Sequence, residues 1–156
     1  MRLPLLAGKI SYVLGYPFIR IWLWRSQRVY VLLCVGDQIL VTKNWLGLHR
    51  RWRLPGGGCH RSEQDIDALV REAREELGIR LAASGIQPLS ARPIHSKKGY
   101  SYSLFIMQLP QKPPLNVNSA EIVETEWIRR EQLCKTPITI ELKSALQLLA
   151  SHQTVL

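Results

Sequence analysis

Three glutamates lie close together in one short stretch of this 156-residue chain: Glu72, Glu75 and Glu76. If the stretch is helical, positions three and four apart are neighbours on its surface, so the three carboxylates would share one flank. Neighbouring like charges destabilise a helix, and a hard divalent cation, which prefers carboxylate oxygens, would offset their repulsion. The alternative is a solvated acidic face, eased by Arg71 and Arg74.

The spacing of apolar residues predicts that this stretch is an amphipathic helix. The residues that recur with the helical period are Ile66, Leu69, Val70, Ala73 and Leu77. Ser62 is the expected N-cap, with Asp65 in the position of a capping box, and Gly78 is the expected end. With the apolar stripe buried, the glutamates lie roughly 120° from its centre.

A glycine-rich segment precedes the helix: Leu54-Pro55-Gly56-Gly57-Gly58. We expect a loop here, after a short strand at 52–54. Glycine allows a sharp turn and lets a ligand come close to the main chain, so carbonyl oxygens of the loop could reach a metal held by the helix. A tight turn without a ligand is the alternative.

The order of residues across loop and helix resembles the Nudix box, GX5EX7REUXEEXGU, in which U is apolar. It consists here of Gly57, five residues, Glu63, seven residues, and then residues 71–79, Arg-Glu-Ala-Arg-Glu-Glu-Leu-Gly-Ile. All nine specified positions match, with Ala73 a small choice at the first apolar one. The strand order around the box also resembles Nudix proteins over most of residues 28–150.

The resemblance implies roles for residues of the box. It implies hydrolysis of a nucleoside diphosphate linked to another group, with Mg²⁺ as the cofactor and Mn²⁺ as an alternative metal. Glu75 and Glu76 would be the principal metal ligands, Glu72 a further ligand or the base, and the Gly56 carbonyl a main-chain ligand. Glu63 and Arg71 would be a structural pair that stabilises the loop and helix.

Nudix proteins often need a carboxylate beyond the box, a few residues before a tryptophan. The candidates before Trp127 are Glu121, Glu124 and Glu126. In a strand, Glu124 and Glu126 would share one face, with Glu121 on the other face or in the loop leading in. We favour Glu121 as the further ligand or base because its spacing from Trp127 resembles one arrangement in the family. Glu124 is the alternative.

Positive side chains near the box could stabilise charge on a phosphoryl group. The candidates for substrate binding are Arg50, Arg51, Arg53, Lys97 and Lys98, with Trp45 as a stacking partner for a base. For each cation the alternative is a solvated surface charge.

The rest of the pattern predicts one mixed domain. Further strands are expected at 28–35, 38–42, 86–95, 100–109 and 121–128. The first two are joined by a turn at 36–37, a second turn lies at 97–99, and a last helix starts at Pro137 with Thr136 as its cap. We therefore expect an α/β (α+β) fold, which the resemblance specifies as a mixed β-sheet sandwiched between helices.

The charge of the chain is uneven. Residues 1–61 hold ten Lys or Arg residues and one acid, whereas the remainder is balanced, and the total is +9. Residues 1–27 form an apolar and basic arm ahead of the domain at 28–156. The arm could pack on its own domain, on a second copy of the chain in a homodimer, or on a membrane surface. Three separated cysteines without a CxxC pair favour a cytoplasmic protein with reduced thiols, peripheral to a membrane if the arm binds lipid.

Three functions stay open at this point. The first is Mg²⁺-dependent hydrolysis of a phosphorylated nucleotide such as a nucleoside triphosphate, ADP-ribose or a nucleotide sugar. The second is a non-catalytic module that binds nucleic acid or a membrane surface; nucleic acid is disfavoured because no RNP-like or helix-turn-helix pattern occurs. The third is hydrolysis of a lipid pyrophosphate.

Overall fold

The computed structural model describes residues 26–44 and 51–153 of the chain. Its strands form one mixed sheet in the order β4-β6-β1-β2-β7, with β3 paired to β1 and β5 to β6. β1 and β6 run parallel, and the other pairs are antiparallel. The strands are β1 (Gln27–Val35), β2 (Gln38–Asn44), β3 (Gly56–Gly58), β4 (Gln87–Pro88), β5 (Ile94–His95), β6 (Ser101–Gln108) and β7 (Ile122–Arg129).

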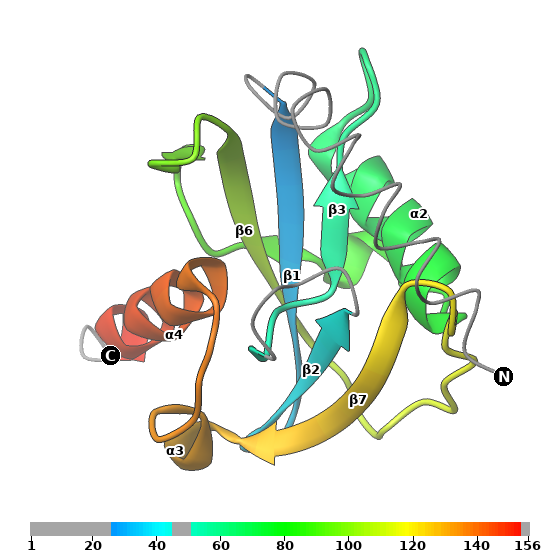
Figure 1. Ribbon diagram of the computed structural model, residues 1–156, viewed down its shortest axis with the longest axis vertical. Helices are drawn as coiled ribbons and strands as arrows, with labels where there is room; N and C mark the ends of the chain where they lie inside the picture. Colours follow the sequence, from blue (N-terminus) through cyan, green and yellow to red (C-terminus); the bar gives the residue numbers. More distant parts are fainter. Residues whose placement is uncertain (1–25, 45–50, 154–156) are drawn as a thin grey trace, which may run out of the picture.

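Helices cover both faces of the sheet (Figure 1). The helices are α2 (Asp65–Leu77), the short α3 (Arg130–Leu133) and α4 (Ile140–Gln153), with a 3₁₀ turn η1 (Ala83–Gly85). One apolar core lies between the sheet and α2, and a second lies between the sheet and α4. The expected fold, a mixed sheet sandwiched between helices, is confirmed.

β1 contributes to both cores because alternate side chains point to opposite faces. Val29 and Val31 belong to the core under α2, whereas Tyr30 and Leu32 belong to the core under α4. This explains why the strand reads as a continuous apolar run. The predicted hairpin is also confirmed, with Val35 opposite Gln38.

The glycines were expected to form a loop, but the structure places them in β3, paired with β1. Gly56 has φ of +130°, and a Cβ atom there would overlap the carbonyl oxygen of Val29 and lie 2.9 Å from the Cα of Tyr30. Only glycine lets the two backbones approach this closely. The expected strand at 52–54 is reduced to isolated bridges, in which Arg53 pairs with Thr42 and Trp52 with Ile138.

Gly56→Ala should therefore lower the free energy of unfolding by about 3 kcal/mol, because it adds a backbone clash to an unfavourable φ. Gly58→Ala is the matched control in the same strand. Its φ is ordinary and a Cβ atom there meets nothing within 4 Å, so its effect should stay within about 0.5 kcal/mol. Urea unfolding followed by circular dichroism measures both. Equal stabilities of the two variants would contradict this account of the glycine strand.

The start of α2 differs from the prediction. The helix begins at Asp65 with Gln64 as its N-cap, and Ser62 has a left-handed φ of 68° instead of acting as the cap. A turn at 60–63 precedes it, in which the Glu63 amide donates to the His60 carbonyl and the His60 amide donates to the Glu63 carboxylate. The predicted end is confirmed, since Gly78 is left-handed and its amide donates to the last helical carbonyls.

Three features in the second half of the chain differ from the prediction. The strand expected at 86–95 is two short strands, because Leu89 and Ser90 both donate to the Leu104 carbonyl and interrupt the pairing. The last helix starts at Ile140, not Pro137, because residues 137–139 pair with Trp52 first. The short helix α3 was not expected.

In the described part of the chain, no helix is long and apolar enough to cross a membrane. Cys34 is buried, Cys59 is half-buried and Cys134 is exposed, and all three are free thiols. The predicted arm at 1–27 lies almost wholly outside the described residues, so its packing stays a prediction.

Candidate active site

Glu76 is an ionisable residue on the buried face of α2, with only 4% of its surface exposed. Its Oε2 accepts a hydrogen bond of 3.0 Å from the Gly56 amide. The sequence placed it beside Glu72 and Glu75, on a flank away from the buried face; Glu76 does interact with Glu72, but it is buried, so its expected position off the buried face is wrong. Ile66 and Val70 are only partly buried, so the buried face of the helix is rotated toward Glu76.

Burial and four neighbouring groups set the pKa of Glu76. Burial raises the pKa of its carboxyl group to about 7. The positive charge of Arg53 and the Gly56 amide act in the opposite direction, and the carboxylates of Glu72 and Glu121 raise the pKa further. Four charged groups from three segments thus act on one another here: Glu72 and Glu76 on α2, Arg53 before β3 and Glu121 before β7.

Glu72 lies against Gly57 of β3, with 14% of its side chain exposed. A Cβ atom on Gly57 would come within 2.6 Å of the Glu72 carboxylate, so the missing side chain leaves the space that this carboxylate fills. Burial is the main cause that raises the pKa of Glu72, and the negative charges of Glu75 and Glu121 add to it. Arg71 opposes them.

Arg71 connects the helix to the turn and to β3. It donates to both carboxylate oxygens of Glu63, at 2.9 and 3.0 Å, and to the carbonyl of Gly58 at 2.8 Å. It also donates to Glu72 at 2.9 Å and to Glu75 at 3.1 Å. The predicted structural pair, Glu63 and Arg71, is therefore a two-bond contact in the structure. Arg71 holds the pKa of Glu63 down at about 2, mainly by hydrogen bonding.

This low pKa predicts how acid unfolds the protein. The stabilisation by ionised Glu63 is fully present above its ordinary pKa of 4.5 and is lost as the pH falls through about 2. Glu63→Gln should therefore be less stable than the wild type at pH 7, and the difference should shrink as the pH falls from about 5 to 2. Urea unfolding at pH 7, 4 and 2.5 measures it. A difference that stays constant with pH would contradict the prediction.

The other predicted carboxylates have different surroundings. Glu75 is exposed, with 59% of its side chain accessible, and pairs with Arg71. Glu121 lies in a turn just before β7, where its amide donates to the Asn118 carbonyl, and its charge reaches Glu72 and Glu76. Glu124 pairs with Lys43 at 2.8 Å, and Glu126 is exposed. Among the described residues, no three His, Cys, Asp or Glu side chains converge closely enough to form a ready metal site.

The structure places the predicted substrate-binding cations differently. Arg51, Arg53 and Lys98 line one cavity, beside the start of β1. Lys97 is exposed in the adjacent turn and does not line it. Arg50 and Trp45 lie outside the described residues.

The same cavity contains residues that sequence reasoning missed. They are Arg28, Tyr30, Asn44, Thr139 and Glu141. Arg28 and Tyr30 are two apart on β1, so their position on one face could have been read from strand alternation. Nothing local indicates that Thr139 and Glu141, more than 100 positions away, complete the lining.

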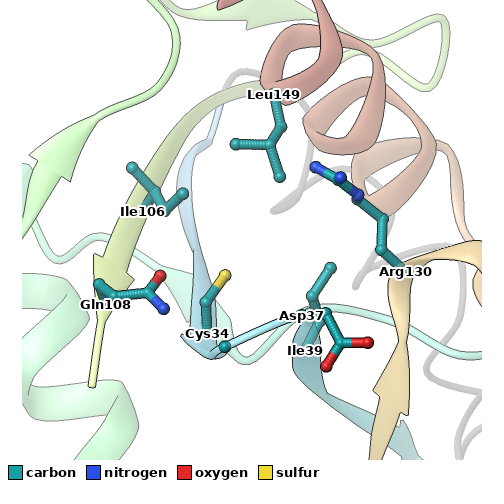
Figure 2. Close-up of a pocket in the computed structure, with 8 residues that line it drawn as sticks. Cys34, Asp37, Ile39, Ile106, Gln108, Arg130 and Leu149 are labelled. Atoms are coloured by element: carbon teal, nitrogen blue, oxygen red, sulfur yellow. The ribbon is translucent and has the colours of Figure 1, made fainter. Parts of the chain in front are cut away.

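A second cavity lies at the other end of β1 (Figure 2). It has a volume of about 280 Å³ and is lined by residues of the β1–β2 turn, β6, α3 and α4, including Cys34, Asp37, Arg130 and Leu149. Burial raises the pKa of the Cys34 thiol to about 11, so the thiol is protonated and a poor nucleophile at neutral pH. No residue of the box lines this cavity, and the glycines of β3 pair with the opposite end of β1.

Comparisons with known proteins agree with this geometry. The NUDIX domain model matches residues 24–149. The chain is 31% identical over 129 residues to the human nucleoside diphosphate-linked moiety X motif 6 protein, covering 78% of this chain and 40% of that protein. It covers 35% of the mouse counterpart, so it spans well under half of these relatives.

A bacterial relative and a solved structure match over more of their length. The chain is 30% identical over 115 residues to the nucleoside triphosphatase NudI of Enterobacter sp. (strain 638), covering 68% of this chain and 78% of that protein. The crystal structure of a MutT NUDIX hydrolase from Burkholderia pseudomallei superposes with a TM-score of 0.63 at 21% identity. The match covers 80% of this chain and 97% of that one. The matched domain, the complete box and the shared fold together show that this chain belongs to the Nudix hydrolase family.

Proposed function

We propose that this protein hydrolyses the phosphoanhydride bond of a nucleoside diphosphate linked to another group, with a divalent cation as cofactor. The observation that carries the proposal is the grouping of Glu72, Glu76 and Glu121 beside Arg53. Carboxylates beside a guanidinium are suited to a phosphorylated ligand and the cation that accompanies it. The relatives above, a nucleoside triphosphatase and a nucleoside diphosphate-linked moiety X protein, support this substrate class.

The donor set fits a magnesium or manganese ion. The charge of Glu121 raises the pKa of both Glu72 and Glu76, which are largely buried, and Gly57 leaves the space for the Glu72 carboxylate. Both ions prefer carboxylate and carbonyl oxygens, and their charge would offset the repulsion. The residues proposed to hold the ion are Glu72, Glu75, Glu76 and Glu121, with the carbonyl of Gly56. When bound, the ion would polarise phosphoryl oxygens and lower the pKa of a bound water.

Each of these residues has a proposed role in the hydrolysis. Water attacks one phosphorus atom, the bridging P–O bond breaks, and the departing phosphate takes the electron pair. Glu121 is the proposed base that accepts the proton of the attacking water, with Glu72 as the alternative. Arg53 stabilises the negative charge that develops on the phosphoryl oxygens. Glu63 and Arg71 hold the turn and helix in place.

A substrate panel tests the proposal. The full chain is incubated with nucleoside triphosphates, ADP-ribose and nucleotide sugars, in Mg²⁺ and in EDTA, and the products are separated by ion-exchange chromatography. We expect Mg²⁺-dependent release of a nucleoside monophosphate from at least one class. No turnover of any member, by a folded chain that still binds anions, would favour the non-catalytic alternative.

A further inference from the structure

The cavity beside the start of β1 is strongly cationic. It has a volume of about 210 Å³, and four of its lining residues are basic: Arg28, Arg51, Arg53 and Lys98. Glu141 is the one carboxylate among its lining residues, and it accepts a hydrogen bond from the Tyr100 hydroxyl.

The positive charges in this cavity make no close ion pair, although the charge of Glu141 acts on Arg28 and Arg53 acts on Glu76. None of the four basic side chains forms an ion pair with a carboxylate of the described residues. Aromatic rings hold two of them instead, with the Arg28 guanidinium 4.8 Å from the centre of the Tyr100 ring and Arg53 5.9 Å from that of Tyr30. Rings position a guanidinium without neutralising it, so the cavity attracts anions.

Unpaired polar atoms also gather here. Four buried side-chain polar atoms of the described residues lack a hydrogen-bond partner, and three belong to residues that line this cavity: Arg28 Nε, Asn44 Oδ1 and Thr139 Oγ1. Buried polar groups are normally paired, and an unpaired one is costly. An oxyanion can accept from the Arg28 N–H and the Thr139 hydroxyl, and so supply the partners of these two donors, whereas the Asn44 oxygen is itself an acceptor and needs a donor.

The cavity is next to the proposed catalytic carboxylates. Tyr30 lines it and is paired across the sheet with Gly56, whose amide binds Glu76. Arg53 also lines it, and its charge acts on Glu76. One ligand could therefore have its reacting group at the carboxylates and another group in the cavity. A cavity of about 210 Å³ is below the roughly 300 Å³ at which pockets for whole small molecules begin, so it suits one group of the ligand.

We propose that this cavity binds a terminal phosphoryl group of the substrate. The protein would then prefer nucleotides that end in phosphate, such as nucleoside triphosphates, over those whose diphosphate joins two sugars, such as ADP-ribose. This inference rests on the proposed function for its kinetic consequence, whereas the anion site itself can be tested without turnover.

Binding of inorganic tripolyphosphate tests the site directly. Isothermal titration calorimetry of the full chain in EDTA excludes both metal binding and hydrolysis. Arg51→Gln/Lys98→Gln should weaken binding at least tenfold, since each removes a charge-assisted contact. Arg129→Gln/Lys135→Gln removes the same charge from exposed positions outside the cavity and should change affinity by less than twofold. Equal losses in the two double variants, or no wild-type binding, would overturn the proposal.

The ratio of kcat/KM for ATP to that for ADP-ribose tests the selectivity. The wild type should favour ATP, and Arg51→Gln/Lys98→Gln should lower the ratio at least tenfold, while the exposed double variant leaves it unchanged. A parallel loss for both substrates would show general attraction of anions and overturn the terminal-phosphate assignment. If the chain hydrolysed nothing, the proposed function would fail, yet tripolyphosphate binding would still decide the anion site.

Discussion

Glu76→Gln should lower the rate of metal-dependent nucleotide hydrolysis by roughly 10³-fold, equivalent to about 4 kcal/mol of transition-state stabilisation. The substitution removes one negative charge from the proposed metal-binding group. Glu75→Gln should lower the rate as well. Initial rates at saturating Mg²⁺ measure both, and Glu131→Gln, an exposed position on α3, is the control that should retain full activity. Wild-type turnover in Glu76→Gln would contradict the assignment.

The same variant should keep its fold. Glutamine is nearly the same shape, and its side-chain oxygen can still accept the bond that Gly56 donates to Glu76. Because burial raises the pKa of Glu76 to about 7, the ionised carboxylate destabilises the metal-free protein increasingly as the pH rises from about 4.5 through 7. In EDTA at pH 8, Glu76→Gln should therefore be at least as stable as the wild type. A large loss of stability would mean that any loss of activity came from misfolding.

The second large effect is expected at Glu121. Glu121→Gln should lower kcat by roughly 10²- to 10⁴-fold and change KM much less, because a base acts in the chemical step. Glu124→Gln is the matched control three residues away. Its carboxylate is engaged by Lys43 at 2.8 Å, whereas the charge of Glu121 acts on Glu72 and Glu76. Steady-state kinetics on one substrate at fixed Mg²⁺ compare the two.

Two results would change this assignment. A large loss of kcat in Glu124→Gln, with Glu121→Gln near the wild type, would transfer the role of base to Glu124. Near-wild-type kinetics in both variants would place the base within the box, and Glu72 would be the first residue to test.

Local patterns predicted the elements whose signals lie within a few residues. Gly78 ends α2 because a left-handed residue is needed there, and the β1–β2 hairpin follows from two apolar runs around a short turn. The three glycines of β3 were misread because their strand pairing comes from β1, more than 20 positions earlier. Likewise, α2 starts at Asp65 without a side-chain cap, next to a turn in which Glu63 contacts Arg71, and no capping pattern contains that contact.

The sequence predicted which types of residue form the site better than it predicted how they are arranged. The box identified the glutamates, but treating Ile66 and Val70 as fully buried rotated the predicted helix face away from Glu76. The cationic cavity needs residues from the start of β1, the end of β2, the segment before β3, the segment before β6 and the start of α4. Such a set becomes visible only when the sheet order is known, which is why Arg28 and Glu141 were missed.

The most direct test of the central claim is the rate of nucleotide hydrolysis as metal is returned to the stripped protein. The full chain is treated with EDTA, exchanged into metal-free buffer and titrated with Mg²⁺ on the best substrate of the panel, beside Glu76→Gln. We predict no turnover without metal, a saturable rise in the wild type, and a rate near background in Glu76→Gln at every concentration. Full turnover in EDTA, or a Glu76→Gln titration that coincides with the wild type, would contradict a metal-dependent hydrolase centred on this carboxylate.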